Sequence, residues 1–420
     1  MSADRRRTVA VIGANLTGGA AVAGLRDRGF EGRIVLIGAE PHPPYERPPL
    51  SKAYLRGERE FDDAILHPQD WYADNDVDAR FGVRATRLDT DASAIDLDDG
   101  STVTYDVALI ATGARNRTFD VPGMDLDGVF QLRTREDADR IRERARPGAR
   151  AIVVGAGFIG CEVAASLRHL GVEIEVLDRG DVALQRVLGR EAGGMVERLH
   201  LDHGVGFRHH AGAERFEGSP VAGLQAVITT QGERIECDLA VVGVGVEPVT
   251  DLVAGTAIQT DNGIVTDRFL RTSVPNVFAA GDVANIESGI FGRHLRVEHW
   301  DNAIKSGGVA ARNMLGDLAP YDDPHWFWSD QYDVEMQYAG NALEWDRYLT
   351  WGSVEDRDFL GFYIHQGIVR GVLGVNRGRD VRRSMALVRA ASPVDERELM
   401  RALDEGVDLR ALATTIGAAR

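Results

Sequence analysis

The segment from Thr8 to Gly19 constrains the fold of this chain most strongly. Its apolar residues 9–12 predict a short buried strand, and the loop Gly13-Ala14-Asn15-Leu16-Thr17-Gly18 then opens a helix of small residues. A strand, a glycine loop and a helix in this order are typical of nucleotide-binding α/β folds, in which the helix N-terminus faces phosphate groups. Asparagine occupies position 15, where the pattern expects its second glycine.

A second copy of the pattern begins at Ala151 and is intact. Its loop reads Gly155-Ala156-Gly157-Phe158-Ile159-Gly160. In such a loop the first glycine makes the tight turn, the second lets the backbone approach a pyrophosphate, and the third lets helix and strand pack closely. We therefore interpret the chain as an α/β protein with two dinucleotide-binding units.

The first unit is expected to end its second strand with an acidic residue that binds ribose hydroxyls. The predicted strand Arg33 to Ile37 is followed by Gly38-Ala39-Glu40, so the acidic residue comes one place late. We interpret Glu40 as this residue, and a solvated loop carboxylate remains the alternative.

The second unit places its acidic residue at the expected distance. The predicted strand Glu173 to Leu177 ends at Asp178, which lies 23 positions after Gly155. A carboxylate there repels a 2′-phosphate and favours NADH, whereas the neighbouring Arg179 leaves NADPH open.

Three further motifs suit a bound ligand. A buried strand ends at Ala111-Thr112-Gly113, and another ends at Ala280-Gly281-Asp282, whose carboxylate is placed to accept a hydrogen bond from a sugar hydroxyl. The proline-rich segment from Pro41 to Lys52 is stiff and suits holding Arg47 and Lys52 in place. A simple linker would also be proline-rich.

Composition excludes several classes of protein. The 420 residues are 44% hydrophobic and 27% charged, which is typical of a soluble globular protein of two or three domains. A net charge of −17 argues against nucleic-acid binding, and no apolar run approaches the roughly 20 residues of a membrane helix. The start lacks a secretion signal, so we expect the cytoplasm. Cys161 and Cys237 have neither metal-ligand nor disulfide spacing, so we expect no metal.

Several elements are predicted outside the two loops. Residues 77–86 and 94–106 are expected to form small antiparallel strands with a turn at Asp98-Asp99-Gly100. Residues 296–312 are expected to begin a helix, with Asp301 and Asn302 as candidate caps. From Asp322 onward, short strands predict an antiparallel sheet, and core packing is one explanation of its aromatic cluster.

These motifs together resemble one family. Tyr-Glu-Arg-Pro-Pro-Leu-Ser-Lys at 45–52, Ala-Thr-Gly at 111–113, Gly-Asp at 281–282 and Phe-Trp-Ser-Asp-Gln-Tyr at 327–332 accompany the two glycine loops. In this order they resemble the FAD-dependent ferredoxin reductases of oxygenase systems, over essentially the whole chain. The resemblance implies a discontinuous FAD-binding domain (1–114 and 245–320), an inserted NAD(H)-binding domain (115–244) and a C-terminal α+β interface domain (321–420).

The resemblance also implies which residues bind each cofactor. Those implied for FAD are Gly13, Asn15, Leu16, Gly18, Glu40, Arg47, Lys52, Ala85, Ala111, Thr112, Gly113, Arg133, Gly281, Asp282 and Trp300. Those implied for NADH are Gly155, Gly157, Phe158, Ile159, Gly160, Glu162, Asp178, Arg179 and Gly245. Lys52 is implied to lie against the flavin and to pair with Glu162, and Trp328 is implied to lie between flavin and ferredoxin.

The implied activity is NADH-dependent reduction of a [2Fe–2S] ferredoxin that supplies a cytochrome P450 or a ring-hydroxylating oxygenase. The protein is expected to be a monomer or weak homodimer, and its ferredoxin to be acidic. Candidate residues for docking that ferredoxin are Arg377, Arg379, Arg382, Arg383, Lys305 and Arg312.

Two alternatives differ in function. A disulfide or peroxide reductase of the same fold would need a cysteine at the flavin, and Cys161 follows the second loop instead. The second alternative is an NADH-sensing flavoprotein that is similar to apoptosis-inducing factor and has little electron-transfer turnover.

Two departures from the family pattern affect the adenosine half of the FAD site. They are Asn15 and the Ala39-Glu40 pair. Asparagine tolerates the left-handed backbone that glycine usually supplies. We expect FAD to be bound less tightly than in close relatives.

Overall fold

The computed structural model describes residues 7–418, which form two compact units. The first unit comprises residues up to Glu46, Ala64–Arg115 and Glu247–Trp326; the second comprises Arg47–Asp63, Asn116–Val246 and Phe327 onward. Each unit has its own hydrophobic core. The strands β8 (Ala114–Asn116) and β17 (Val246–Pro248) lie where the chain passes from one unit to the other.

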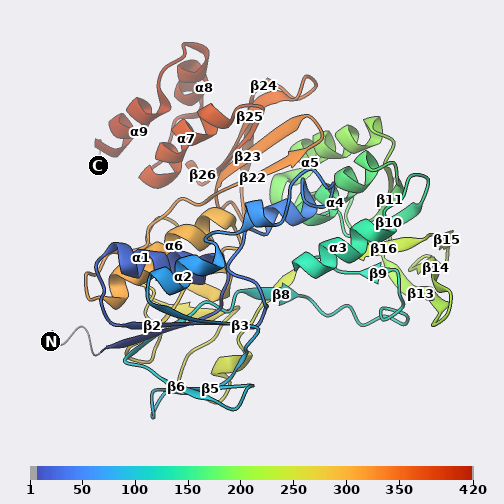
Figure 1. The fold of residues 1–420 in the computed structure, drawn as a ribbon. Coiled ribbons are helices and arrows are strands. Elements are labelled where there is room, and N and C mark those ends of the chain that lie inside the picture. Colours follow the sequence, from blue (N-terminus) through green and yellow to red (C-terminus); the bar gives the residue numbers. More distant parts are fainter. Residues whose placement is uncertain (1–6, 419–420) are drawn as a thin grey trace. The chain divides into compact units, whose positions relative to one another are not determined.

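The first unit is built on a five-stranded parallel sheet of order β19-β7-β1-β2-β3, of which Figure 1 labels β2 and β3. Its strands are β1 (Thr8–Ile12), β2 (Arg33–Gly38), β3 (Val77–Phe81), β7 (Val107–Ile110) and β19 (Val277–Ala279). Helices α1 (Leu16–Asp27) and α6 (Trp300–Met314) pack against each other beside it. The central strands are almost wholly apolar because neighbours cover them on both sides.

Two small sheets and a short helix complete the first unit. They are β4 (Ala85–Asp89), β5 (Ala94–Leu97) and β6 (Thr102–Thr104); β18 (Ile264–Thr266), β20 (Ala284–Ser288) and β21 (Arg293–Arg296); and α2 (Gln69–Asp74). The predicted turn at residues 98–100 joins β5 to β6, with Gly100 at φ +84°.

Two of the predictions for this unit were wrong in detail. Strand β3 joins the edge of the parallel sheet, and its polar Asp78 is there ion-paired with Arg33 at 2.7 Å. Helix α6 starts at Trp300 with His299 as its N-cap, so Asp301 and Asn302 lie inside the first turn. The Asn302 amide instead donates to the Val297 carbonyl at 2.8 Å.

The second unit repeats the same arrangement around the second glycine loop. Its parallel sheet has the order β12-β11-β10-β16-β9. The strands are β9 (Val129–Phe130), β10 (Arg150–Val154), β11 (Glu173–Leu177), β12 (Gly206–Arg208) and β16 (Leu239–Val242); the helices are α3 (Arg135–Arg144), α4 (Phe158–His169) and α5 (Gln185–Asp202). An antiparallel sheet, β13 (Ala213–Ser219), β14 (Gly223–Thr229) and β15 (Arg234–Glu236), follows. The expected α/β fold with two Rossmann-like units is confirmed.

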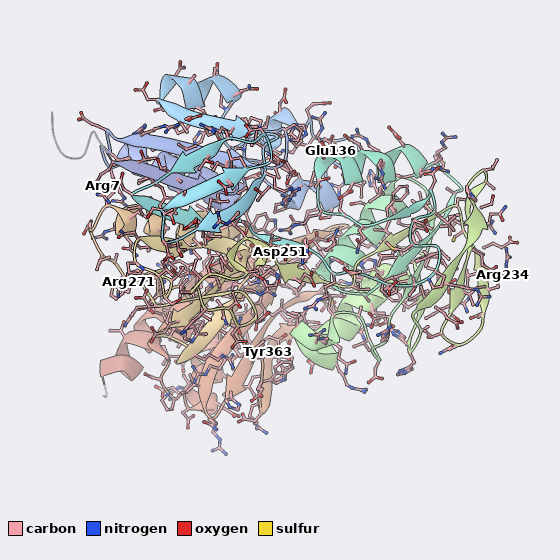
Figure 2. All side chains as sticks on the ribbon, turned by 90° about the horizontal axis from the view of Figure 1, so that it is seen from below. Arg7, Glu136, Arg234, Asp251, Arg271 and Tyr363 are labelled. Carbon is pink, nitrogen blue, oxygen red and sulfur yellow. The ribbon has the colours of Figure 1, made fainter. Side chains whose placement is uncertain are left out.

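The C-terminal part of the second unit is the predicted antiparallel sheet, of order β22-β23-β26-β25-β24. Its elements are β22 (Trp326–Gln331), β23 (Val334–Gly340), β24 (Arg347–Ser353), β25 (Asp358–His365), β26 (Ile368–Val375), α7 (Gly378–Ala390), α8 (Glu396–Asp404) and α9 (Leu409–Ala418). The fully buried Tyr363, labelled in Figure 2, donates from its hydroxyl to the Leu188 carbonyl at 2.8 Å and so joins β25 to α5. Within residues 7–418, no helix is long and apolar enough to span a bilayer.

Candidate functional site

The first glycine loop follows β1 and turns tightly at Gly13. This glycine has φ +122°, and a Cβ on it would lie 2.0 Å from the Ala111 carbonyl oxygen. A Cβ on Gly18 would lie equally close to the Gly13 carbonyl. Both positions therefore admit only glycine, and the loop has the close packing that a dinucleotide fold requires.

Asn15 caps helix α1 with its side chain. Its amide oxygen accepts hydrogen bonds from the backbone N–H groups of Thr17 at 3.0 Å and Gly18 at 3.3 Å, and its Nδ2 donates to the Ala111 carbonyl at 2.5 Å. Its backbone is extended, with φ −120°, so position 15 does not need the left-handed conformation considered from the sequence. The side chain bonds to helix N–H groups of the kind that bind phosphate in related folds.

The other first-unit residues implied by the resemblance gather mainly at one edge of the parallel sheet. Because β1, β7 and β19 run parallel, Gly13, Gly113 and Asp282 all follow the carboxyl ends of neighbouring strands. Gly281 has φ +72°, and a Cβ on it would lie 2.3 Å from Thr17 Oγ1. This edge is where ligands bind in open α/β sheets.

Glu40 and Trp300 each form a side-chain hydrogen bond within this unit. The Tyr45 hydroxyl donates to Glu40 Oε2 at 2.5 Å, so Glu40 is held rather than left as a free loop carboxylate. The indole of Trp300, at the first position of α6, donates to Glu46 at 3.1 Å. His299 makes no side-chain cap for α6, and burial lowers the pKa of His299 to about 3, which keeps it neutral.

The second glycine loop has the same backbone but an open helix N-terminus. Gly155 has φ +103°, and a Cβ on it would lie 2.5 Å from the Gly243 carbonyl oxygen. Gly157 is the N-cap of α4, where no side chain caps the helix, and a Cβ on it would meet nothing within 4 Å. The cradle therefore has free space in front of the helix, as a dinucleotide pyrophosphate needs. Ile159, in the first turn of α4, is 48% exposed.

Asp178 is fixed at the end of β11 by the backbone. Its carboxylate accepts hydrogen bonds from the N–H groups of Ala156 at 2.8 Å and Gly180 at 2.7 Å. Two such bonds fix the orientation of the carboxylate next to the loop. Arg179 is exposed, and its guanidinium lies beside Gly212.

Lys52 and Glu162 form a largely enclosed ion pair in the second unit. Lys52 Nζ lies 2.7 Å from Glu162 Oε2, and the two side chains are 13% and 4% exposed. Lys52 follows the short 3₁₀ helix Pro48–Ser51, whose prolines restrict the backbone, and Glu162 lies on α4 just after the second loop. The sequence resemblance implied this pair, and the two side chains are in contact.

Glu162 also accepts two hydroxyl hydrogen bonds that sequence reasoning missed. Ser51 Oγ donates to Oε2 at 2.5 Å, and Ser329 Oγ donates to Oε1 at 2.6 Å. A buried carboxylate needs such donors because its remaining lone pairs are hidden from water. One sequence signal would have helped: the chain contains only two lysines, Lys52 and Lys305, among its 48 basic residues.

Trp328 lies on β22, the strand that also carries Ser329. It is half-buried. Side chains alternate along a strand, so Trp328 and Asp330 share one face while Ser329 and Gln331 share the other.

The remaining implied residues occupy separate places. Arg47 donates to the Arg133 carbonyl, and the Arg133 N–H donates to Asp137 at 3.0 Å beside the capping box of α3. Ala85 begins β4, where it is half-buried. Gly245 has φ +99° and is exposed.

The expected docking cations are largely paired with acidic residues. Lys305 binds Asp301 at 2.6 Å and Asp323 at 2.9 Å. Further pairs are Arg312 with Asp317, Arg377 with Asp358 and Arg383 with Asp380. Arg379 and Arg382 are exposed on α7, so they are the better candidates for contact with an acidic partner.

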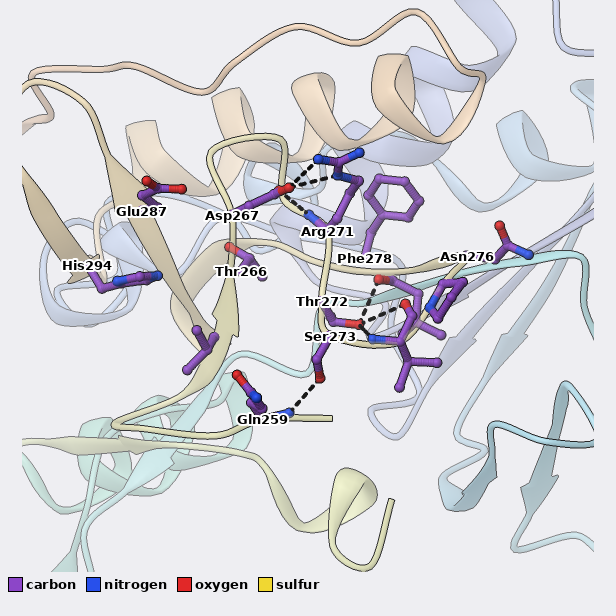
Figure 3. Close-up of a pocket in the computed structure, with 14 residues that line it drawn as sticks. Gln259, Thr266, Asp267, Arg271, Thr272, Ser273, Asn276, Phe278, Glu287 and His294 are labelled. Atoms are coloured by element: carbon purple, nitrogen blue, oxygen red, sulfur yellow. Dashed lines mark hydrogen bonds and ion pairs between the residues drawn. The ribbon is translucent and has the colours of Figure 1, made fainter. Parts of the chain in front are cut away.

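A cavity of about 650 Å³ in the first unit is remote from these groups (Figure 3). Its lining includes Asp267, Arg271 and residues 272–278, and Asp267 is ion-paired with Arg271 there. Because residues 272–276 precede β19, the cavity lies at the amino end of that strand, opposite the edge that carries the glycine loop. It is therefore a poor candidate for a dinucleotide.

Metal and thiol chemistry find little support. Among residues 7–418 there is no group of three or more potential metal ligands. Cys161 and Cys237 are buried free thiols, and burial raises the pKa of each thiol, that of Cys237 to about 12. Neither cysteine is a reactive thiolate.

Comparison with known proteins places the chain among reductases. Residues 7–307 match the pyridine nucleotide-disulphide oxidoreductase family, and residues 326–413 match the reductase C-terminal family. Rhodocoxin reductase of Rhodococcus erythropolis is 35% identical over 404 residues, covering 96% of this chain and 93% of that protein. The ferredoxin–NAD(+) reductase subunit of the benzene 1,2-dioxygenase system of Pseudomonas putida is 35% identical, covering 93% and 94%. A solved covalent complex of putidaredoxin reductase with putidaredoxin has a TM-score of 0.93 at 33% identity, covering 98% and 99%.

The buried His200 predicts a pH dependence of stability. Burial lowers the pKa of His200 to about 4 from an ordinary 6.5, so below pH 6.5 the unfolded chain binds a proton that the folded chain does not. Stability present above this pH is therefore lost as the pH falls toward about 4. We expect the melting temperature to drop between about pH 7 and about pH 5, and His200→Gln to reduce the drop. The control is His294→Gln at an exposed position, and an equal drop in both variants would contradict the prediction.

Proposed function

Because the chain belongs to the pyridine nucleotide-disulphide oxidoreductase family, we propose that it is an NADH-dependent flavoprotein reductase that passes electrons through FAD to a [2Fe–2S] ferredoxin. That ferredoxin supplies a cytochrome P450 or a Rieske-type oxygenase; one of the relatives is named as part of a dioxygenase system. The observation that carries the proposal is the enclosed pair of Lys52 and Glu162, which lies just after the open glycine loop. A purely structural pair would not need lysine in a chain that otherwise uses arginine almost throughout.

The proposed cofactor sites follow the two loops. FAD is assigned to residues 1–114 and 245–320 and NADH to residues 115–244, with 321–420 as the interface domain. The glycines at 13 and 155, neither of which tolerates a Cβ, support both sites. Bound FAD would supply the chemistry that links a two-electron hydride donor, NADH, to a one-electron iron–sulfur carrier.

The protein groups orient the cofactors and balance charge. Asp178, held by two backbone N–H groups, is placed to accept a hydrogen bond from a ribose hydroxyl, and its charge favours NADH over NADPH. The Lys52 ammonium would stabilise negative charge on bound FAD, and Glu162 fixes the position of Lys52. Glu162 keeps its place because Ser51 and Ser329 also donate to it.

Partner recognition is assigned to the C-terminal domain. Trp328 is half-buried on β22, and Arg379 and Arg382 are exposed on α7, where they suit an acidic ferredoxin. The two free cysteines suit a reducing compartment, so we place the protein in the cytoplasm. We also propose that it is a monomer or weak homodimer.

The proposed reaction predicts a ferredoxin-dependent assay. With NADH and FAD present but no ferredoxin, the protein should reduce cytochrome c slowly. Adding a [2Fe–2S] ferredoxin should raise the rate by about tenfold or more, since turnover requires the carrier. Initial rates with NADH and NADPH measure the cofactor preference in the same assay. A slow, long-lived charge-transfer complex with NADH, with no response to ferredoxins, would favour the sensor instead.

Lys52→Ala tests the assigned lysine. Removing the ammonium withdraws a favourable charge, so we expect flavin reduction by NADH in stopped flow to slow by about tenfold or more. Arg56→Ala, which removes a nearby ion pair with Glu58, is the control, and its flavin should be reduced by NADH at the unmodified rate. An unchanged rate in Lys52→Ala would remove the role.

Asn15→Gly tests the capped first loop. Losing the side-chain cap should lower the melting temperature of the FAD-free protein, because a helix cap contributes about 1 kcal/mol. It should also increase the FAD retained on purification and lower the dissociation constant, because N–H groups of α1 become available. Reduced FAD retention would refute the idea that the Asn15 side chain competes with FAD for these N–H groups. Thr134→Ala, which removes the cap of α3, is a control for general destabilisation.

A further inference from the structure

A one-way series of hydrogen bonds crosses the interior of the second unit and ends on Glu162. The Tyr332 hydroxyl lies 3.2 Å from His200 Nδ1, and His200 Nε2 lies 2.7 Å from Gln331 Oε1. Gln331 Nε2 donates to Ser329 Oγ at 3.1 Å, and Ser329 Oγ donates to Glu162 Oε1 at 2.6 Å. We call these five residues the Glu162 chain.

Every donor of the Glu162 chain points toward the carboxylate. Burial keeps His200 neutral, so it carries one N–H and one acceptor nitrogen, and its partners assign the N–H to Nε2. Burial also raises the pKa of Tyr332, so its hydroxyl stays protonated. The Gln331 amide accepts at its oxygen and donates from its nitrogen. Hydrogen bonds aligned in this way polarise one another and strengthen the last bond, to Glu162.

Burying the polar residues of the Glu162 chain costs free energy of folding, which suggests that they have a role. His200, Gln331 and Ser329 are each 0% exposed, and they lie among the apolar side chains that pack α5 against the C-terminal sheet. Burying polar groups is unfavourable unless each is hydrogen-bonded, and apolar residues of similar size would pack there as well. Only the far end, Tyr332, is partly exposed, and it lines a cavity with Arg168 and His203.

We propose that Ser329, Gln331 and His200 are positioning residues that act through Glu162 to hold the Lys52 ammonium in place. This inference rests on the proposed function of Lys52 at the flavin. An amide does not readily pass a proton onward, so the chain orients and polarises Glu162 and does not conduct protons to it. Because Ser329 and Gln331 share β22 with Trp328, the strand assigned to ferredoxin contact is the same strand that positions the ion pair.

The test is a double-mutant cycle of Ser329→Ala and Gln331→Met in the full chain. Its first readout is the rate at which an amine-specific reagent labels Lys52, measured by mass spectrometry without FAD. Lys305, the chain's other lysine, is an internal reference in every digest. The matched controls are Ser384→Ala and Gln337→Met, which change buried residues of the same types; Ser384 bonds only the Asp380 carbonyl on α7 among the contacts that the described residues show.

Each single variant should raise the Lys52-to-Lys305 labelling ratio by about threefold or more, because a loosened carboxylate holds its ammonium less firmly. The double variant should have the same labelling ratio as Ser329→Ala, because the series of hydrogen bonds links Gln331 to Glu162 through the Ser329 hydroxyl. The controls should leave the ratio unchanged. With FAD bound, the same variants should shift the flavin midpoint potential to more negative values.

Unchanged labelling ratios in both single variants, or additive increases in the double variant, would overturn the proposal. Should Ser329→Ala fail to fold, Ser329→Cys keeps the volume and still removes the strong donor. If Lys52→Ala leaves flavin reduction unaffected, the proposed function of Lys52 fails, yet the labelling ratio still decides whether the Glu162 chain holds the pair.

Discussion

The buried ion pair of Lys52 and Glu162 places the strongest demand on the second unit. A carboxylate that is 4% exposed is stable as an anion only when its lone pairs meet donors, and here one ammonium and two serine hydroxyls provide them. Those donors come from the proline-rich segment, which ends at Lys52, and from β22. Two stretches of sequence are thereby tied to α4, directly after the loop assigned to NADH.

The two glycine loops show how one backbone design can serve with different side chains. Gly13 and Gly155 make the same left-handed turn, and each lies against the end of a neighbouring strand. At the next landmark the loops diverge, because Asn15 caps its own helix whereas Gly157 leaves the helix N-terminus open. A self-capped loop is stable without a ligand, and an open loop relies on the ligand for its hydrogen bonds.

Much of the fold was predictable because its signals are local. The two strand-loop-helix units, the turn at Gly100 and the three strands β24 to β26 follow from glycine placement and apolar runs. Predictions failed where polar residues lie inside an element: Asp78 sits on an edge strand through an ion pair, and Asp301 lies within α6 because Lys305 pairs with it. No strand was predicted at β22, because the sequence shows an aromatic cluster there and the buried partners of its serine and glutamine come from distant segments.

For the site, the sequence by itself determined the two nucleotide loops, the acidic residue at the end of β11 and the segment that carries Lys52. Turn geometry and strand ends depend on residues that are neighbours in the chain, so their spacing is sufficient. The tertiary structure alone decided that Ser329 donates to Glu162, 167 positions away, and that His200 and Gln331 continue the contact. Such pairs arise only when α4, α5 and β22 pack together, because burial is what obliges each polar group to find a partner.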